Sequence, residues 1–484
     1  MKNKSLKKNY LLNLIHQVLT IFVPFITTPY ISRVLQADGV GAYSYTLATA
    51  TYIGIFATLG MDVYGQLQVA KYREDRRESS RLVYGIFLAK LATTAIIITV
   101  YMTLEPVIGM YTNLYRVMIV FFLSQVVDFT WFFQGIEKFG FILTRNVFVK
   151  AIGIVCIFCF VKEPDDVVKY ALIIQGTAFV GNLLVLPYLC KFLLPVSLTQ
   201  IKIVSYIKGG MIYFIPTIAT SVYTMLDKAM IGWVTKSSYE NGYYEQAYKI
   251  VQIVLVIVTS LRTVTLPRVI HLYSEKNYEA VINIIDSTIR FVLLISLPMS
   301  AGLMIVAPQL VPIFLGDSFE KCIVIVCILA PLIVVLGLST LVSGQCLTAM
   351  GKQKQANVCV IVGAAANFTM NLILIPNYGA LGAAIATVCA ETLIMIMFFG
   401  YGSEYIKLKM VWKYFVKYLS CSFVMVVGIY GLKYLDLDKD VLLLCQVIAG
   451  IIVYFSAVLL TKDELLVSFL HSIRDRKIKN DSQE

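Results

Sequence analysis

Long apolar stretches alternate with short polar segments along almost the whole chain. Each apolar stretch is about 20 residues long and lacks strict alternation of apolar and polar positions, which favours membrane-spanning helices over the strands of a β-barrel. The pattern therefore predicts an all-α polytopic membrane protein with about fourteen transmembrane helices. The predicted spans run approximately over residues 10–35, 40–68, 82–104, 112–134, 144–161, 167–190, 209–234, 243–270, 287–307, 322–346, 357–376, 379–402, 413–433 and 441–461.

Composition agrees with this pattern. The 484 residues are 58% hydrophobic and only 14% charged, and the mean hydropathy is +0.78. A soluble protein of this size would need far more polar surface. The first apolar run, Leu11–Leu35, is too long for the apolar part of a secretory signal peptide and lacks a small-residue cleavage site, so we interpret it as the first spanning helix.

The basic residues are distributed unevenly between the two sides of the predicted topology. If the N-terminus is cytoplasmic, roughly 28 of the 41 Lys and Arg residues fall on inner segments, among them Lys138, Arg145 and Lys150. An even number of spans then places both termini in the cytoplasm. The net charge of +12 is therefore mostly topological, and nucleic acid is not expected as a partner.

A short sequence motif occurs twice. Phe22–Thr28 (FVPFITT) resembles Phe214–Thr220 (FIPTIAT), and Gly41–Tyr45 (GAYSY) resembles Gly242–Gln246 (GYYEQ). Each pair falls in the first two spans of one half, an even number of spans apart, which indicates a parallel repeat; a chance match of short apolar strings is the alternative. The predicted division is an N-lobe of six helices at 1–190, a cytoplasmic linker at 191–208, a C-lobe of six helices at 209–402, two further helices at 403–461 and a cytoplasmic tail at 462–484.

Charged residues inside the spans are candidates for function, because each costs about 2.5–3.5 kcal/mol near the bilayer centre. Lys90, Lys228 and Arg262 suit a water-filled cavity that binds an anionic group such as a phosphate. Asp227 precedes Lys228 and points about 100° away from it on a helix, so only one of the two faces a narrow cavity. We predict that Lys90, Lys228, Arg262 and Asp227 bind substrate.

Two further acidic residues are candidates for a coupling ion. Glu391 lies near the middle of its span, where it either binds a proton or cation or pairs with a buried basic side chain. Asp128 either lines the inner mouth of a cavity or pairs with Lys90. Asp62 and Arg290 lie close to inner ends of spans, where structural or interfacial pairing is the better interpretation.

The sequence also offers two candidate hinges and lacks the motifs of common enzymes and metal sites. Pro24 and Pro216 are candidate hinges for gating, with ordinary packing kinks as the alternative. The ten cysteines lie mostly in apolar runs, and the Cys156–Cys159 pair has no His or carboxylate nearby, so no metal site is expected. The chain lacks a phosphate-binding GxxxxGK[ST] loop, an HExxH motif and a GxSxG motif, and its loops are too short for a catalytic domain. We therefore expect no enzyme activity.

Several longer stretches, in order along essentially the whole chain, resemble one family of transporters. They include Thr27–Gln66, IPTIATSVYTMLDKAMIG with GYYEQAYKIV, Thr265–Ser274 (TLPRVIHLYS), Gly344–Val358 (GQCLTAMGKQKQANV) and Asn367–Glu391. Together they are similar to the polysaccharide-biosynthesis flippases of the multidrug/oligosaccharidyl-lipid/polysaccharide exporter (MOP) superfamily, of the type that moves O-antigen or capsule repeat units. Gln36–Asp38 departs from the family pattern of a glycine and an acidic residue, so this turn is expected to differ.

The resemblance implies a V-shaped fold like that of the multidrug and toxin extruders (MATE), with two six-helix lobes around a central cavity and two added helices. It implies alternating access without ATP or a bound cofactor, coupled to an H⁺ or Na⁺ gradient. The implied substrate is an undecaprenyl-diphosphate-linked oligosaccharide, moved from the inner to the outer leaflet of a bacterial cytoplasmic membrane. Membrane lipids and a polysaccharide polymerase complex are further expected partners, and the protein is expected to be monomeric.

Three alternative functions stay open. A lipid II flippase of the same superfamily is the nearest. A multidrug cation antiporter would usually have twelve spans and an acidic cavity. A membrane sugar polymerase or glycosyltransferase would need a large outer loop with catalytic carboxylates or arginines, and the predicted loops are too short for one.

Overall fold

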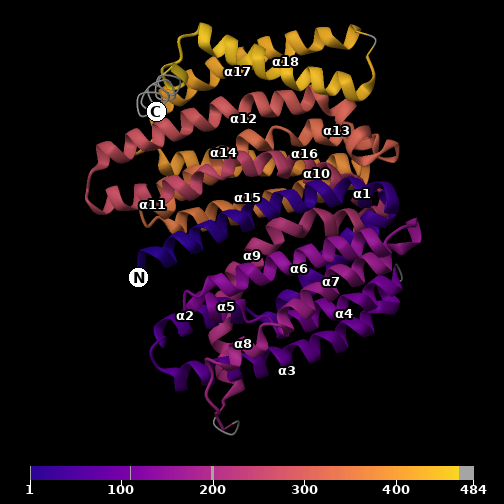
Figure 1. The fold of residues 1–484 in the computed structure, drawn as a ribbon, viewed down its shortest axis with the longest axis vertical. Helices are drawn as coiled ribbons and strands as arrows, with labels where there is room; N and C mark the ends of the chain where they lie inside the picture. The colour runs from indigo at the N-terminus through magenta and orange to yellow at the C-terminus, as the bar shows by residue number, and fades with distance from the viewer. Residues whose placement is uncertain (1, 109–110, 198–200, 436, 468–484) are drawn as a thin grey trace, which may run out of the picture. The chain divides into compact units, whose positions relative to one another are not determined.

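The structure is a computed structural model that describes residues 2–108, 111–197, 201–435 and 437–467; the side chains of residues 2–21, 104–108, 139, 215–224 and 263–264 are not part of this description. Every regular element in these ranges is helical (Figure 1). The chain folds into two compact units, Met1–Glu245 and Gln246–Glu484, and the boundary falls inside helix α10. The lobe boundaries near residues 190 and 209 stay a prediction.

The first unit contains nine helices, a 3-10 turn and the start of a tenth helix, counted over the described residues. They are α1 (Lys2–Thr58), α2 (Met61–Lys71), α3 (Arg76–Ile108), α4 (Thr112–Val126), α5 (Thr130–Gly135), α6 (Phe139–Phe160), η1 (Pro164–Asp166), α7 (Val167–Leu183), α8 (Leu186–Cys190), α9 (Ile203–Thr235) and α10 (Ser238–Thr259).

The second unit continues from α10. Its further elements, over the described residues, are α11 (Leu261–Ser274), α12 (Tyr278–Leu315), η3 (Asp317–Phe319), α13 (Lys321–Leu329), α14 (Leu332–Val342), the π-helical turn η4 (Ser343–Thr348), α15 (Gln353–Tyr378), α16 (Ala380–Gly402), α17 (Leu408–Tyr430), η5 (Gly431–Tyr434) and α18 (Lys439–Leu460).

The length and hydropathy of these helices suit a membrane. In the part of the chain that the structure describes, ten helices are long and apolar enough to cross a bilayer, and an eleventh span results if Phe22–Thr58 and Met61–Lys71, bent by 44°, count as one. The chain is therefore a multi-pass membrane protein, as predicted. The number of fourteen spans and the side on which the termini lie stay predictions.

Helix α1 is interrupted where the sequence departs from the family pattern. Its backbone continues through Pro24 and Pro29, but Gln36 adopts φ 56° and ψ −174°, which is not helical. Two helical stretches therefore meet at Gln36, between the predicted spans 10–35 and 40–68. A second break follows at Gly60, whose φ of 72° is in the left-handed region that glycine adopts without strain.

In the first unit, α4 buries one face between α3 and α7. Its buried residues Leu114, Tyr115, Met118 and Phe122 recur at helical spacing, and Tyr101 of α3 contacts the rings of Tyr115 and Phe122. This packing fixes α4 and α7 side by side, and the cavity described below lies along them.

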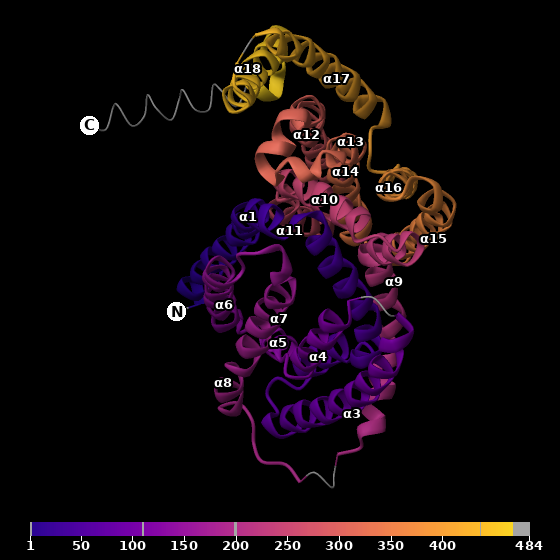
Figure 2. The same ribbon diagram turned by 90° about the vertical axis from the view of Figure 1, so that its right-hand side faces the viewer.

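In the second unit, small residues bring α15 and α16 together. Gly382 lies so close to α15 that a Cβ atom would be 2.5 Å from the carbonyl oxygen of Leu374. The Gly/Ala run Gly379–Thr387 is thus a helix-packing surface, as its composition indicates. The last two long helices, α17 and α18, lie side by side and pack against α12 (Figure 2).

Candidate functional site

A cavity of about 620 Å³, which we call the α6 cavity, lies within the first unit. Helices α1, α4, α6 and α7 supply its wall. On α6 the lining residues Asn146, Val149, Gly153 and Ile157 recur every three or four positions, so one face of this helix follows the cavity. The polar lining residues are Thr27, Ser124, Gln125, Asp128, Arg145, Asn146, Lys150, Tyr170, Gln175, Thr177 and Asn182.

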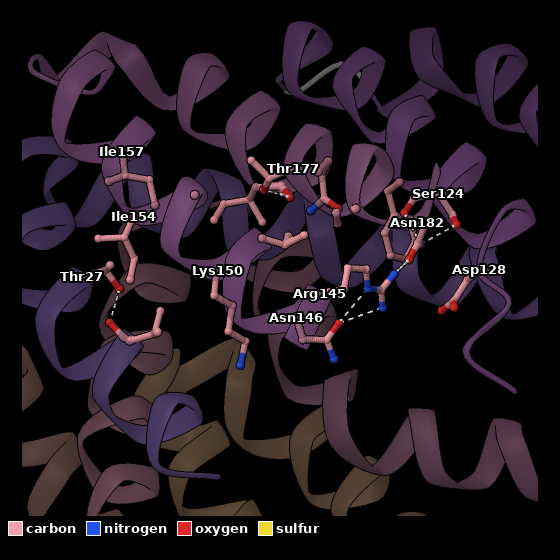
Figure 3. A pocket seen from close by; sticks show the side chains of 18 of the residues that line it. Thr27, Ser124, Asp128, Arg145, Asn146, Lys150, Ile154, Ile157, Thr177 and Asn182 are labelled. Atoms are coloured by element: carbon pink, nitrogen blue, oxygen red, sulfur yellow. Dashed lines mark hydrogen bonds between the residues drawn. The ribbon is translucent and has the colours of Figure 1, made fainter. Parts of the chain in front are cut away.

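Arg145 is held in a fixed position in this cavity (Figure 3). Its Nε and Nη2 donate to Oδ1 of Asn146 at 3.1 and 2.8 Å, and its Nη1 donates to Oδ1 of Asn182. Asn182 in turn donates from Nδ2 to the carbonyl and the hydroxyl oxygen of Ser124, both at 3.0 Å. A single polar chain therefore connects α6, α7 and α4.

Two further charged residues line the same cavity. Lys150 follows Arg145 on α6, and Asp128 lies directly after α4. Oδ1 of Asp128 accepts a hydrogen bond of 2.8 Å from the backbone nitrogen of Thr130, which fixes the carboxylate at the start of α5. The lining residues thus include two cations and one carboxylate, so the lining carries an excess positive charge that suits an anionic ligand.

Arg145 and Lys150 are the site residues that sequence reasoning missed. Both count among the basic residues of an inner segment in the predicted topology, whereas the structure places them within α6, on the cavity wall. The available signal was their position inside the predicted span 144–161, together with Asn146 between them. Asp128, predicted to line a cavity mouth or to pair with Lys90, lines this cavity.

Lys90 is buried behind the cavity wall. Only 1% of the residue is exposed, and its ammonium forms an ion pair with Asp62 and donates to the carbonyl oxygen of Gln125 at 3.1 Å. The bond to Gln125 places a positive charge near the C-terminal end of α4, where the helix dipole favours a cation. Lys90 is thus a neighbour of the cavity and is not among its lining residues. The pairing interpretation of Asp62 is confirmed.

Asp227 and Lys228 both have partners on the next helix, α10. The Lys228 ammonium lies 2.6 Å from Oε2 of Glu245, and the Tyr244 hydroxyl donates to Oδ2 of Asp227 at 2.6 Å. Ser44 of α1 donates to the same oxygen of Glu245 at 2.9 Å. Neither Asp227 nor Lys228 is among the lining residues of the α6 cavity.

The two glycines of the repeated motif meet at this place. A Cβ on Gly41 would lie 1.8 Å from the carbonyl oxygen of Ser238, and a Cβ on Gly242 would lie 2.1 Å from that of Ala37. Asp38 and Ser238 are hydrogen-bonded beside them. We call Ala37, Asp38, Gly41, Ser238 and Gly242 the α1–α10 contact. This close approach requires a glycine on each of the two helices.

The remaining predicted site residues lie elsewhere. Arg262, at the start of α11, lies against Gly344, where an added Cβ would be 2.7 Å from its Nε. Glu391 is buried within α16. Pro24 lies inside α1, and Pro216 falls within the bounds of α9 but its side chain lies outside the described residues. Arg262, Glu391 and Pro24 are not among the lining residues of the α6 cavity.

Comparison with known proteins gives a consistent assignment. Residues 6–273 match the family described as polysaccharide biosynthesis protein. The chain is 24% identical over 400 residues to a putative O-antigen transporter of Shigella dysenteriae, covering 81% of this chain and 98% of that protein. It is 22% identical over 403 residues to a putative O-antigen transporter of Escherichia coli K12, covering 81% of this chain and 96% of that protein.

Solved structures show the same fold. The lipid II flippase MurJ, in an inward closed conformation, superposes with a TM-score of 0.73 at 14% identity, over 94% of this chain and 99% of that one. An inward-facing multidrug resistance MATE family transporter of the MOP superfamily gives 0.59 at 15% identity, over 81% and 99%. The predicted MATE-like fold is confirmed. Because the family match also extends over more than half of the sequence, the chain belongs to the polysaccharide biosynthesis protein family.

Proposed function

We propose that this protein is a flippase that moves an undecaprenyl-diphosphate-linked oligosaccharide from the inner to the outer leaflet of a bacterial cytoplasmic membrane. The observation that carries the proposal is the cavity in a polysaccharide biosynthesis protein, lined by Arg145 and Lys150. The names of the two O-antigen transporters support the same substrate class.

The lining of the cavity suits both parts of such a headgroup. A guanidinium binds phosphate oxygens with two parallel hydrogen bonds, and an ammonium adds a second point charge. Amides and hydroxyls such as those of Gln125, Gln175 and Thr177 pair with sugar hydroxyls. A volume of about 620 Å³ is in the range of small-ligand pockets, which suits part of a headgroup.

The proposal includes a transport cycle without bond chemistry. The lobes predicted at 1–190 and 209–402 alternate in access, driven by an H⁺ or Na⁺ gradient, with Asp128 and Glu391 as the carboxylates that carry the coupling ion. Lys228, Arg262 and the prolines Pro24 and Pro216 keep their predicted roles in later steps of the cycle. The protein acts as a monomer that delivers its product to a polysaccharide polymerase complex.

Transport in proteoliposomes tests the proposal. The purified chain is reconstituted with a fluorescent undecaprenyl-diphosphate-linked oligosaccharide, and a membrane-impermeant reductant measures how much fluorophore reaches the opposite leaflet. We expect movement without ATP. Efflux of cationic drugs with no movement of any lipid-linked oligosaccharide would contradict the proposal and favour a multidrug antiporter.

Charge removal in the cavity tests the site. Arg145→Gln and Lys150→Gln each should slow transport at least tenfold, because each removes a contact to the diphosphate. Arg116→Gln, which removes an exposed guanidinium from α4 outside the cavity, is the matched control and should transport normally. Normal transport by both cavity variants would exclude this cavity as the diphosphate site.

A lipid II flippase is the second candidate, favoured by the TM-score of 0.73 to MurJ. Lipid II also carries a polyprenyl diphosphate, so Arg145 and Lys150 serve it equally well. The same proteoliposomes, loaded with lipid II and with the oligosaccharide lipid in turn, distinguish the two: exclusive movement of lipid II would replace the first proposal with the second.

A further inference from the structure

We infer that Asn146 and Asn182 are positioning residues that fix the Arg145 guanidinium with neutral oxygens and so keep its full positive charge for an anionic headgroup. This inference rests on the proposed function and deepens it. It assigns the selectivity for anions to two asparagines rather than to the arginine alone.

Arg145 is oriented by hydrogen bonds to neutral acceptors. In the described part of the chain, its three hydrogen bonds use Nε, Nη1 and Nη2, and amide oxygens accept all of them. The guanidinium is therefore oriented on both of its sides before any ligand arrives. Such preorganisation lowers the conformational entropy lost when a ligand binds.

Asn182 is buried between three helices and bonds to two of them. Only 9% of this residue is exposed, and both of its amide groups are engaged: the oxygen accepts from Arg145, and the nitrogen donates to Ser124. With these bonds the amide of Asn182 connects α4, α6 and α7 at one point. The orientation of Arg145 therefore follows the packing of these three helices.

The acceptors of the Arg145 hydrogen bonds are amides and not carboxylates. A carboxylate at position 146 or 182 would add the attraction between opposite charges to its hydrogen bond with the guanidinium. It would also cancel the positive charge that an incoming diphosphate needs. Asp128, the carboxylate of the lining, interacts with Arg145 electrostatically, but its Oδ1 accepts from the backbone nitrogen of Thr130, and none of the three hydrogen bonds of Arg145 goes to it. The amides of Asn146 and Asn182 thus fix the orientation of the Arg145 guanidinium without neutralising its charge.

The test separates geometry from charge by isosteric substitution. Asn182→Asp and Asn146→Asp are made in the full chain, and isothermal titration in detergent measures binding of farnesyl diphosphate, a short polyprenyl diphosphate, with neutral farnesol as comparison. We expect at least tenfold weaker binding of farnesyl diphosphate by each variant and unchanged binding of farnesol. The melting temperature of Asn146→Asp should equal or exceed that of the wild type, because only the acceptor oxygen of Asn146 bonds to Arg145. The melting temperature of Asn182→Asp should fall, because aspartate cannot donate to Ser124.

Two further variants complete the design. Asn113→Asp adds the same charge at an exposed position in the first turn of α4, outside the cavity, and should bind within twofold of the wild type. Asn182→Asp combined with Arg145→Gln should bind no more weakly than Arg145→Gln alone, since the asparagine acts through the arginine.

The outcomes distinguish this inference from the proposed function. Normal binding by Asn182→Asp and Asn146→Asp, together with a loss in Arg145→Gln, would overturn the inference and leave the proposed site intact. Normal binding by Arg145→Gln as well would overturn both the inference and the site. If Asn182→Asp does not fold, the less buried Asn146→Asp decides between these results.

Discussion

At the scale of single residues, the charges inside the helices fall into two groups. Lys90, Lys228 and Arg290 are paired with carboxylates, whereas Arg145 bonds to neutral amides in a cavity. Hydropathy and residue type treat these cations alike. The two groups differ in their partners, because a charge inside the protein needs either an opposite charge beside it or a polar cavity around it.

Lys90→Met should therefore reduce stability and leave ligand binding unchanged. The substitution leaves the Gln125 carbonyl and the Asp62 carboxylate without their shared donor, which we expect to cost about 1–3 kcal/mol; the Asp62 side chain is 44% exposed, which limits the loss. Thermal unfolding in detergent measures the change. Asp62→Asn in the same chain should recover part of it, and a tenfold loss of farnesyl diphosphate binding by folded Lys90→Met would contradict our placement of Lys90.

At the scale of elements, the repeated motif acquires a structural meaning. Gly41 and Gly242 correspond in the repeat, and both lie in the α1–α10 contact. The backbone of α10 fills the space where a side chain at position 41 would lie, and the backbone of α1 fills the space of a side chain at position 242. Next along α10, Glu245 pairs with Lys228 of α9 and accepts a hydrogen bond from Ser44 of α1. The Asp227–Lys228 pair in α9 is thus half of a polar helix–helix contact.

Gly41→Ala should destabilise the protein by about 1–3 kcal/mol, because its Cβ would overlap a backbone oxygen that cannot rotate away. Gly176→Ala in α7 is the matched control, since an added Cβ there meets nothing within 4 Å. Differential scanning fluorimetry of both variants checks the prediction. Equal melting temperatures for Gly41→Ala and the wild type would show that α1 and α10 separate without cost.

Asp463, which follows α18, accepts hydrogen bonds from α12 and α17 and gives stability a pH dependence. Burial opposes its ionisation, but hydrogen bonds from Lys417, Arg290 and Tyr418 outweigh burial and lower the pKa of its carboxyl to about 2. Because the pKa is lowered, this contribution is complete above the unfolded value of about 3.9 and is lost as the pH falls from about 4 to about 2.

Asp463→Asn should thus be less stable than the wild type at pH 7 by about 1–3 kcal/mol, because three donors lose a charged acceptor. The difference between the two melting curves should shrink below pH 4. Melting temperatures recorded in detergent between pH 7 and pH 3 check both statements, and a difference that grows as the pH falls would contradict the assigned direction.

At the scale of the whole molecule, the basic residues and the even number of predicted spans predict that both termini lie in the cytoplasm. Green fluorescent protein fused to either end should fluoresce, and alkaline phosphatase fused to either end should be inactive, since each reporter folds on only one side of the membrane. An active phosphatase at one terminus alone would require an odd number of spans and would contradict the fourteen-helix topology.

The sequence by itself determined the helical membrane fold and the family resemblance, and it predicts the repeat. These features follow from local quantities, namely run length, hydropathy and the order of motifs, which do not depend on distant contacts. Even the break in α1 at Gln36 has a local signal, since the adjoining turn departs from the family pattern.

Only the tertiary structure decided which charges meet. Asp62 and Lys90 are 28 positions apart, and Arg145 and Asn182 are 37 positions apart; no local pattern encodes such pairs. The sequence therefore selected Lys90 and Lys228 as candidate cavity cations, and the structure shows that each is paired with a carboxylate. It also shows that Arg145 and Lys150, which the sequence reasoning overlooked, line the α6 cavity. The physical reason is that solvation of a charge depends on its neighbours in space, so a cation in the middle of a span can be a paired structural group while one near its end lines the cavity.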